Sequence, residues 1–447
     1  MRKKVVLVSL GSRGDVQPYC VLGQALAARG HDVVIATEKR MESLVTTEFQ
    51  LPFKCILGDV CAYLFDPFLQ KRLRTAGFLE SLEIMSTWNK DLDVRDILAS
   101  YEAALAGADI VVSGVVAVTE SYCVAEKHRQ VWIPLFLGNF VAPTSDYPQW
   151  IFDTLAPLHC GWLNKWTHWF LFRKMWAKQQ RHIAPWRHDV LQLPPITSKF
   201  GLLEALLAND AITIYQGCST LLAGPRSVPP TDIAPPNGVY TGFLFPRETG
   251  TGSSLLQAFL QRATQDNVPV IYVGFGSTPM LEPEALLDLV DQVCHMAKCR
   301  CVFALGWSAT ASITPRSLSV FVGTSLPHPW LFPQMRCIVH HAGLGTTAAA
   351  LRSGVPQIPC PEVTDQFYNA KQLVRLGVAL RVIRSKQLSA ATLTKAVVAV
   401  LHNENHVRLT AQSIGEFVAE ESNGNVDRLC DAILATTPTF GSNGCVQ

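Results

Sequence analysis

The sequence predicts an α/β protein built from two Rossmann-like, doubly wound halves. The first observation is that short apolar runs alternate with helix-periodic segments in the first third of the chain. The second is a proline-rich stretch at 225–237, beyond which the alternation starts again. The third is that strand-to-helix turns in both halves are rich in glycine and hydroxyl side chains. Two such halves are expected to face a central cleft at the carboxyl ends of both sheets.

The first half opens with a strand–helix–strand unit. Val5–Leu10 predicts a buried strand, Val21–Ala27 has the spacing of a helix, and Val33–Ala36 predicts the next strand. The runs at 109–113 and 132–136 predict two further strands of the same parallel sheet.

The second half repeats the alternation after the proline-rich stretch. Strands are expected at 268–275, 301–305, 320–322, 336–339 and 357–359, and helices at 282–297, 346–353, 366–376, 389–401 and 405–418. The predicted domains are therefore 1–224 and 238–420, joined by a linker at 225–237 and followed by a carboxyl-terminal helix and loose tail at 421–447.

The composition suits a well-buried globular protein, with 48% hydrophobic and 17% charged residues. The formal net charge of +2 is too small to indicate a nucleic-acid partner. The 13 cysteines are scattered and odd in number, which is typical of reduced thiols, and the cluster 294–301 lacks the further ligands of a zinc site. No apolar run reaches the roughly 18–20 residues of a membrane span. We therefore expect a cytoplasmic protein, soluble or peripheral on membranes, that holds no metal.

The most informative stretch is His-His-Ala-Gly-Leu-Gly-Thr-Thr at 340–347, between an apolar strand and a helix. Small residues let backbone N–H groups approach an anion, and the helix N-terminus adds partial positive charge. His341 lies where its side chain would donate to the same anion. The stretch thus predicts a diphosphate site, and Ser277, after another strand, would assist. The alternative is a tight turn packed with small residues.

Two further turns carry carboxylates. The turn 11–18 presents Arg13, which suits a phosphate, and Asp15, which suits the proton of an acceptor hydroxyl. Its glycine spacing is not that of a dinucleotide fold, for which Glu38 would be a weak ribose ligand. Downstream, Asp365-Gln366 offers a carboxylate and a carboxamide to neighbouring hydroxyls of a sugar. The alternatives are that Asp15 caps a helix and that Asp365 begins one.

In this order the motifs resemble those of the GT-B-fold glycosyltransferases. The chain is most similar to the sterol 3-beta-glucosyltransferases and their bacterial antibiotic-glycosylating relatives, through 11–18, 326–333, 340–347 and 365–366, and more weakly through 185–187 and 193–195. It departs from the family at Ala342, where Gly is usual and Ala is tolerable if φ is negative. It also departs at 361–364, which leaves the identity of the sugar open.

The resemblance implies inverting transfer of a hexose, glucose first, to the hydroxyl of a lipophilic, sterol-like acceptor. The donor would be a nucleotide-sugar co-substrate, UDP-glucose first, with no other cofactor and no metal. The first domain would bind the acceptor and the second the donor. Asp15 would be the general base. The diphosphate would meet Ser12, Arg13, Ser277, His341, Gly343, Gly345 and Thr346; the sugar would meet Asp365 and Gln366; the nucleoside would meet Trp307, Leu326, Pro327 and His328.

An aromatic and basic segment at 148–188 is the candidate for the acceptor side. Helical spacing places Trp162, Trp166 and Trp169 on one face, which Phe172 and Trp176 continue. These tryptophans, with Phe65 in a second apolar loop, are the predicted acceptor residues. Residues 158–181 would also rest on an anionic membrane surface. The alternative is an amphipathic helix packed on the core of the first domain.

Rival functions remain open at this point. The acceptor could instead be a polyketide, a phenolic compound or a glycolipid. A catalytically silent protein that binds lipid or nucleotide sugar would use the same scaffold. A nucleotide-sugar epimerase would need a set of catalytic acids in the donor site, which Asp365 and Glu362 alone do not supply.

Overall fold

The computed structural model describes most of the chain. The described residues are 1–75, 80, 83–84, 91–138, 143–149, 152, 160–207, 212–223, 238–247, 250–276, 283–306, 315, 317–324, 326–363, 365–402, 404–437 and 440. The predicted linker 225–237 lies outside them, as do the predicted site residues Ser277 and Trp307.

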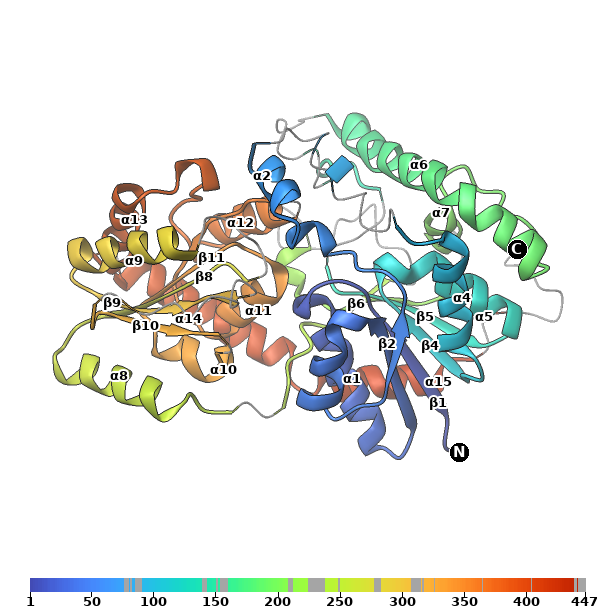
Figure 1. Cartoon of the computed structure of the whole chain (residues 1–447), viewed down its shortest axis with the longest axis horizontal. Helices are drawn as coiled ribbons and strands as arrows, with labels where there is room; N and C mark the ends of the chain where they lie inside the picture. Colours follow the sequence, from blue (N-terminus) through green and yellow to red (C-terminus); the bar gives the residue numbers. More distant parts are fainter. Residues whose placement is uncertain are drawn as a thin grey trace. The chain divides into compact units, whose positions relative to one another are not determined.

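The chain forms two compact units (Figure 1). Unit 1 comprises Met1–Tyr63, Gly77–Pro246 and Glu421–Gln447, and unit 2 comprises Leu64–Ala76 and Arg247–Glu420. The described residues of the carboxyl-terminal segment, 421–437 and 440, therefore pack with unit 1, where Arg29 on the first helix contacts Asp427 and Asp431 at 3.1 and 3.3 Å. The short segment 64–76 lies in the first half of the sequence but belongs to unit 2.

Unit 1 contains a parallel sheet in the order β3-β2-β1-β4-β5-β6-β7. Its strands are β1 Lys4–Val8, β2 Asp32–Glu38, β3 Phe53–Ile56, β4 Ile110–Ser113, β5 Val131–Phe136, β6 Ile214–Gln216 and β7 Gly238–Tyr240. Its main helices are α1 Arg13–Ala28, α4 Val94–Leu105, α5 Val118–His128, α6 Gly161–Pro185, α7 Leu202–Leu207 and α15 Asn425–Ala435. All four predicted strands are present. The strands β3, β6 and β7 were not predicted because they are only three or four residues long and lack a clear apolar run.

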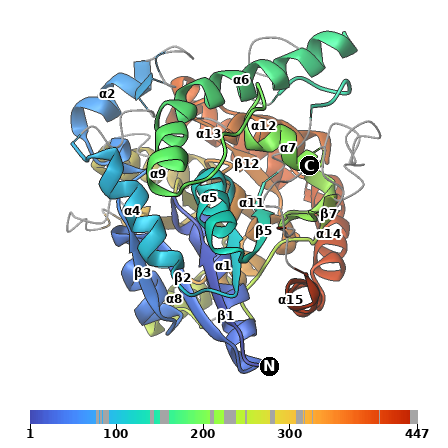
Figure 2. The same ribbon diagram turned by 90° about the vertical axis from the view of Figure 1, so that its right-hand side faces the viewer.

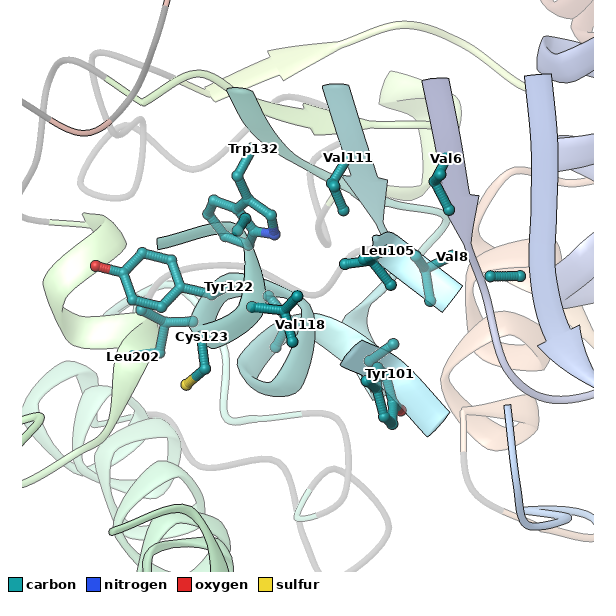
Figure 3. Packing of buried hydrophobic residues seen from close by; sticks show 14 of the residues in the cluster. Val6, Val8, Tyr101, Leu105, Val111, Val118, Tyr122, Cys123, Trp132 and Leu202 are labelled. Carbon is teal, nitrogen blue, oxygen red and sulfur yellow. The ribbon is translucent and has the colours of Figure 1, made fainter. Parts of the chain in front are cut away.

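The core of unit 1 lies between the sheet and helices α4 and α5 (Figure 3). Val6, Val111 and Trp132 come from β1, β4 and β5, and Tyr122 of α5 meets the edge of Trp132 at a centroid distance of 5.2 Å. The indole nitrogen of Trp132 donates to Ser113 Oγ at 3.0 Å, so the largest buried side chain is satisfied. This packing fixes the strand ends from which the site is built.

Unit 2 contains a second parallel sheet in the order β10-β9-β8-β11-β12. Its strands are β8 Val270–Gly274, β9 Arg300–Ala304, β10 Val320–Gly323, β11 Cys337–His340 and β12 Gln357–Pro359. Its helices are α2 Pro67–Thr75, α8 Ser254–Gln265, α9 Pro283–Ala297, α10 His328–Leu331, α11 Leu344–Arg352, α12 Gln366–Arg375, α13 Ala390–His402 and α14 Glu404–Glu421. Every strand predicted for the second half is present, within one or two residues.

Each sheet has one topological switch point, where successive strands leave in opposite directions. In unit 1 the chain runs outward from β1 through β2 to β3 and then returns to β4 on the other side of β1. In unit 2 it runs outward from β8 to β10 and returns to β11 on the other side of β8. Doubly wound proteins bind ligands beside the carboxyl ends of the strands at such points. The fold therefore marks the ends of β1 and β4 and the ends of β8 and β11.

Candidate functional site

In unit 2, hydrogen bonds to both the N–H and the carbonyl of Ala342 hold the backbone of the turn after β11. The Ala342 N–H donates to His340 Nδ1 at 3.2 Å, and Asn369 Nδ2 of α12 donates to the Ala342 carbonyl at 3.0 Å. His340 Nε2 in turn meets Gln357 Oε1 at 2.9 Å. The φ of Ala342 is +62°, so the condition under which Ala would be readily tolerated here, a negative φ, is not met. Ala adopts the left-handed region at a cost of about 1–2 kcal/mol, which these two hydrogen bonds offset.

The His341 ring is held between two glycines. A Cβ built at Gly276, just after β8, would lie 2.6 Å from His341 Cε1. A Cβ built at Gly343 would overlap His341 Nε2. Gly276 also has φ +60°, and Gly306 after β9 packs directly on the Gly276 carbonyl. Glycine is therefore needed at these positions so that the imidazole sits at the junction of β8 and β11.

His341 is uncharged at neutral pH. Burial, and then the neighbouring His340 and His328, lower its pKa to about 3, and burial lowers the pKa of His340 to about 4. Its Nδ1 is buried without a hydrogen-bond partner among the described residues. Buried polar atoms are normally paired. A neutral imidazole carries one N–H, so His341 suits a ligand oxygen as a hydrogen-bond donor rather than as a cation.

These lowered pKa values predict how stability depends on pH. The unfolded chain binds protons on His340 and His341 below about pH 6.5, whereas the folded chain does not until about pH 4 or 3, so stability falls as pH falls through this window. Replacing His341 by Gln removes one such group. Urea unfolding should show that, between pH 6.5 and 4, this variant loses on the order of 3 kcal/mol less of its free energy of unfolding than the wild type does. The exposed His406→Gln should keep the wild-type slope, and equal slopes for His341→Gln and wild type would contradict the assignment.

The helix after this turn begins earlier than predicted. The helix α11 starts at Leu344 instead of residue 346, with Gly343 as its N-cap. Gly345 is exposed and Thr346 is half-buried in its first turn, where backbone N–H groups lack partners inside the helix. The Thr347 hydroxyl is buried and has no partner in the described part of the chain. Thr347 is thus a further candidate for binding the diphosphate. It lies in the motif 340–347 but was not among the predicted diphosphate residues.

The predicted sugar-binding pair lies next to the same turn. Asp365 precedes α12, and its Oδ2 accepts from Asn369 Nδ2 at 3.1 Å, the same nitrogen that binds the Ala342 carbonyl. Gln366 is buried, and its Oε1 accepts from the N–H groups of Glu362 and Val363 at 3.0 and 3.2 Å. Gln366 therefore shapes its own loop through its oxygen. Asn369 was missed, and its place one helical turn after Asp365 was the available signal.

The nucleoside candidates lie at the end of β10. His328 Nε2 meets the Tyr272 hydroxyl at 3.1 Å, and the imidazole stacks on Phe332 with a centroid distance of 4.3 Å. Leu326 and Pro327 are half-buried, and Leu326 packs against Gly323. These contacts fix His328 within unit 2. Its neighbour in the prediction, Trp307, lies outside the described residues.

In unit 1, Asp15 stands at the switch point after β1. Both Ser12 N and Ser12 Oγ donate to Asp15 Oδ2 at 2.8 Å, so Asp15 does support the start of α1. A Cβ at Gly11 would lie 2.5 Å from Oδ2, and Gly11 has φ +127°, so only glycine fits beneath this carboxylate.

The predicted turn 11–18 is shorter than expected, because α1 begins at Arg13 and contains Pro18. Burial of the next helical residues outweighs the one hydrogen bond that proline removes.

Two charged residues close to Asp15, one in this turn and one at the end of β2, have partners of their own. The Arg13 guanidinium makes a bidentate pair with Glu48 at 2.9 and 2.6 Å and also donates to Gln17. Arg13 thus pairs with Glu48 in this structure, a contact that sequence spacing could not show. Glu38 is buried and accepts from the N–H groups of Gly11 and Val60 at 3.1 and 2.5 Å. Burial raises the pKa of Glu38 to about 7. Glu38 therefore braces the turn that carries Asp15.

The expected continuous aromatic face of α6 is divided. Trp162 and Trp166 are 73% and 50% exposed, whereas Phe172 and Trp176 are buried. Trp169 is half-buried and packs on Phe200 with a centroid distance of 4.7 Å. Phe65 belongs to the segment that clusters with unit 2, so the predicted acceptor residues do not all lie in one unit.

Across the described residues, no group of three or more His, Cys, Asp or Glu side chains is arranged to hold a metal ion. No helix of the described chain is long and apolar enough to cross a membrane.

Two protein families match parts of this sequence. Residues 5–128 match the glycosyltransferase family 28 N-terminal domain, and residues 309–433 match the erythromycin biosynthesis protein CIII-like C-terminal domain. The sterol 3-beta-glucosyltransferase of Candida albicans is 30% identical over 414 residues, covering 89% of this chain and 26% of that protein. The sterol 3-beta-glucosyltransferase of Komagataella phaffii is 30% identical over 436 residues, covering 94% and 34%. The chain thus spans about a quarter to a third of the length of these relatives.

Solved glycosyltransferase structures share the fold. The calicheamicin glycosyltransferase CalG4 aligns with a TM-score of 0.63 at 17% identity, over 97% of this chain and 98% of that one. The Streptomyces sp. SF2575 glycosyltransferase SsfS6 complexed with thymidine diphosphate aligns with a TM-score of 0.58 at 16% identity, over 97% and 99%. At these identities the likeness establishes the fold alone, and it confirms the predicted pair of Rossmann-like parallel-sheet domains.

Proposed function

The chain belongs to the GT-B-fold glycosyltransferases related to the sterol 3-beta-glucosyltransferases, and we propose that it is an inverting glycosyltransferase. It transfers a hexose, glucose first, from a UDP-sugar to the hydroxyl of a lipophilic acceptor, sterol-like first. One observation carries the proposal. The switch point of unit 1 presents a carboxylate, Asp15, and the switch point of unit 2 presents a glycine-bounded imidazole, His341, beside a helix N-terminus.

On the donor side, unit 2 supplies an anion site. The N–H groups of the first turn of α11 and the neutral His341 donate to the diphosphate of the donor. Asp365, held by Asn369, accepts hydrogen bonds from hydroxyls of the sugar. The base of the nucleotide lies near Leu326, Pro327 and His328. Gly343, Gly345 and Thr346 allow the close backbone approach that a diphosphate needs.

On the acceptor side, unit 1 supplies the base. The acceptor oxygen attacks the anomeric carbon, the bond between that carbon and the diphosphate oxygen breaks, and UDP leaves with the electron pair. The proton of the hydroxyl passes to the Asp15 carboxylate. A donor joined in the α configuration therefore yields a β-glycoside.

The growing negative charge on UDP is met by hydrogen-bond donors of unit 2, so we propose that the reaction needs no metal ion. Donor turnover with the protein kept in excess EDTA tests this part of the proposal. Undiminished turnover supports it, and loss that is restored by Mg²⁺ or Mn²⁺ contradicts it.

Asn369 gives a specific prediction for the donor site. Its Nδ2 donates to both the Ala342 carbonyl and the Asp365 carboxylate, so Asn369→Ala removes both hydrogen bonds. We expect the variant to lose about 1–3 kcal/mol of stability and to bind donor more weakly, because the buried Ala342 carbonyl and the half-buried Asp365 carboxylate both lose this donor. Urea unfolding and donor titration measure the two effects. Asn369→Asp places a carboxylate, which cannot donate, beside the same two acceptors. It should therefore reduce stability and donor binding more than Asn369→Ala does; the opposite order would contradict the bridging role.

Thermal unfolding with a panel of nucleotide sugars tests the proposed donor. A ligand that binds the folded state alone raises the unfolding temperature according to its affinity. UDP-glucose should give the largest shift, ahead of other UDP-sugars and of dTDP-sugars. The panel includes dTDP-sugars because one glycosyltransferase of the same fold was solved with thymidine diphosphate. Stabilisation by none of these donors would contradict the proposal. A larger temperature shift with a dTDP-sugar would indicate dTDP, in place of UDP, as the nucleotide of the donor.

The other acceptor classes and the silent binding protein are separated by product analysis. Polyketide, phenolic and glycolipid acceptors enter the same assay beside a sterol. Donor binding without transfer to any of them would favour a catalytically silent protein. Contact with a lipid surface through 158–181, of which residues 158–159 lie outside the described part, is a separate question that sugar transfer does not require.

A further inference from the structure

The outward side of α6 combines exposed tryptophan and basic side chains with the half-buried Phe170, which also meets Phe152 at a centroid distance of 6.0 Å. We name it the α6 outer face and define it by seven residues: Trp162, Trp166, Phe170, Arg173, Lys174, Lys178 and Arg181. The two tryptophans are among the most exposed large apolar side chains described, and the four basic residues are exposed as well. Figures 1 and 2 show α6 at the periphery of unit 1, on the side of the sheet where its strands end.

The aromatic half of this face is not needed to hold α6 in place. On the opposite side of the helix, Asn164 Nδ2 donates to the Ser145 carbonyl at 3.0 Å, and Thr167 Oγ1 accepts from Gln149 N at 2.8 Å. His168 Nε2 meets the Tyr147 carbonyl at 3.1 Å. These buried polar contacts anchor the first half of α6, and Trp176 anchors the second half. Trp162 and Trp166 are therefore left for another partner.

The aromatic and basic parts are continuous. Trp166 stacks on Phe170 with a centroid distance of 5.0 Å, and the Lys174 ammonium lies 5.5 Å from the centroid of Phe170. Each of these residues is one helical turn from the next, so one strip runs from aromatic rings to ammonium groups. Indole rings with one apolar and one polar edge prefer the headgroup level of a bilayer.

Charge identifies the partner. Residues 161–185 contain five of the 38 Lys and Arg residues and none of the 36 Asp and Glu residues, so the rest of the chain carries a formal charge of −3. Positive charge is thus concentrated on this helix although the whole chain is nearly neutral. Such a face is complementary to a surface of dense negative charge that also accepts aromatic rings, and an anionic phospholipid bilayer offers both.

We propose that the α6 outer face docks the protein on anionic phospholipid membranes, with α6 lying along the surface. Trp162 and Trp166 enter the headgroup region, and Arg173, Lys174, Lys178 and Arg181 meet lipid phosphates. This inference goes beyond the sugar-transfer proposal and stands without it, because docking requires neither donor nor acceptor. Docking would hold the carboxyl edge of the unit 1 sheet, where Asp15 lies, close to membrane lipids.

Sedimentation with lipid vesicles tests the docking in the absence of donor and acceptor. The full chain is mixed with vesicles of phosphatidylcholine alone or of phosphatidylcholine and phosphatidylserine in equal parts. We expect binding to the anionic vesicles, weakened by salt. Lys174→Gln with Lys178→Gln should weaken it by about 10- to 30-fold, since each basic residue near an anionic surface contributes about fivefold. Trp162→Ala with Trp166→Ala should weaken it by about tenfold or more.

Matched variants in unit 2 control for charge and exposed apolar area. Lys386→Gln with Lys395→Gln, and Leu255→Ala with Leu318→Ala, alter exposed side chains of unit 2 and should leave binding unchanged. Because all substituted α6 residues are on the surface, each variant should unfold at the wild-type temperature. No binding to anionic vesicles, or equal losses in the α6 and unit 2 variants, would overturn the proposal. Binding with no detectable sugar transfer would leave it intact and count against the proposed activity alone.

Discussion

Replacing Asp15 by Asn is expected to lower kcat by about 10²–10⁴-fold, the contribution of a positioned general base. Asn keeps the size of the side chain and one oxygen to accept from Ser12 N, so the start of α1 is retained. It cannot take the proton of the attacking hydroxyl. The KM for the donor should change little, because the donor residues lie in unit 2. Initial rates of UDP release with a saturating acceptor measure the effect.

A matched control separates catalysis from helix capping. Asp96 occupies the third position of α4, as Asp15 occupies the third position of α1, and it is exposed. Asp96→Asn removes the same charge from a helix N-terminus at a cost of about 0.3–1 kcal/mol and should leave kcat unchanged. If Asp15→Asn retained more than about a tenth of the wild-type kcat, Asp15 would be a capping residue and not the base.

Replacing His341 by Ala is expected to lower kcat by about 10²–10³-fold, as when one preorganised donor to a developing anion is removed. The imidazole lies between Gly276 and Gly343 and carries an unpartnered Nδ1. It is neutral, with its pKa lowered to about 3, so the loss should be the same at pH 6 and pH 8. A charged imidazole would instead give a larger loss at the lower pH.

Glycine variants test the geometry without removing the ring. Gly343→Ala would push a methyl group onto His341 Nε2 and should also reduce kcat. Gly250→Ala adds the same methyl group where nothing lies within 4 Å and should have no effect. If His341→Ala and Gly343→Ala both kept the wild-type kcat, the imidazole would be a packing residue of the turn.

The parts of the site that lie in continuous motifs could be predicted from the sequence. The stretch 340–347 and the turn at Asp15 each follow an apolar strand, and strand ends in a doubly wound sheet place them at the switch points. The strands themselves follow from runs of buried apolar residues rich in β-branched side chains, such as Val5–Val8.

Contacts between distant segments could not be predicted in this way. Arg13 was expected at a phosphate, yet its partner Glu48 lies 35 residues away, and no local pattern joins them. The positive φ of Ala342 depends on Asn369, which comes from a different helix. On α6, the aromatic spacing predicted one continuous aromatic face, but hydrogen bonds of Asn164, Thr167 and His168 hold the first half of the helix so that Trp162 and Trp166 stay exposed.

The most direct measurement is product formation from UDP-glucose and a membrane sterol. The account predicts that UDP and a sterol β-glucoside appear in equal amounts, and that Asp15→Asn slows the formation of both by at least about a hundredfold while it still binds donor. Folded wild-type protein that yields no glycoside with any donor and acceptor of the panel, or a product of retained α configuration, would contradict it.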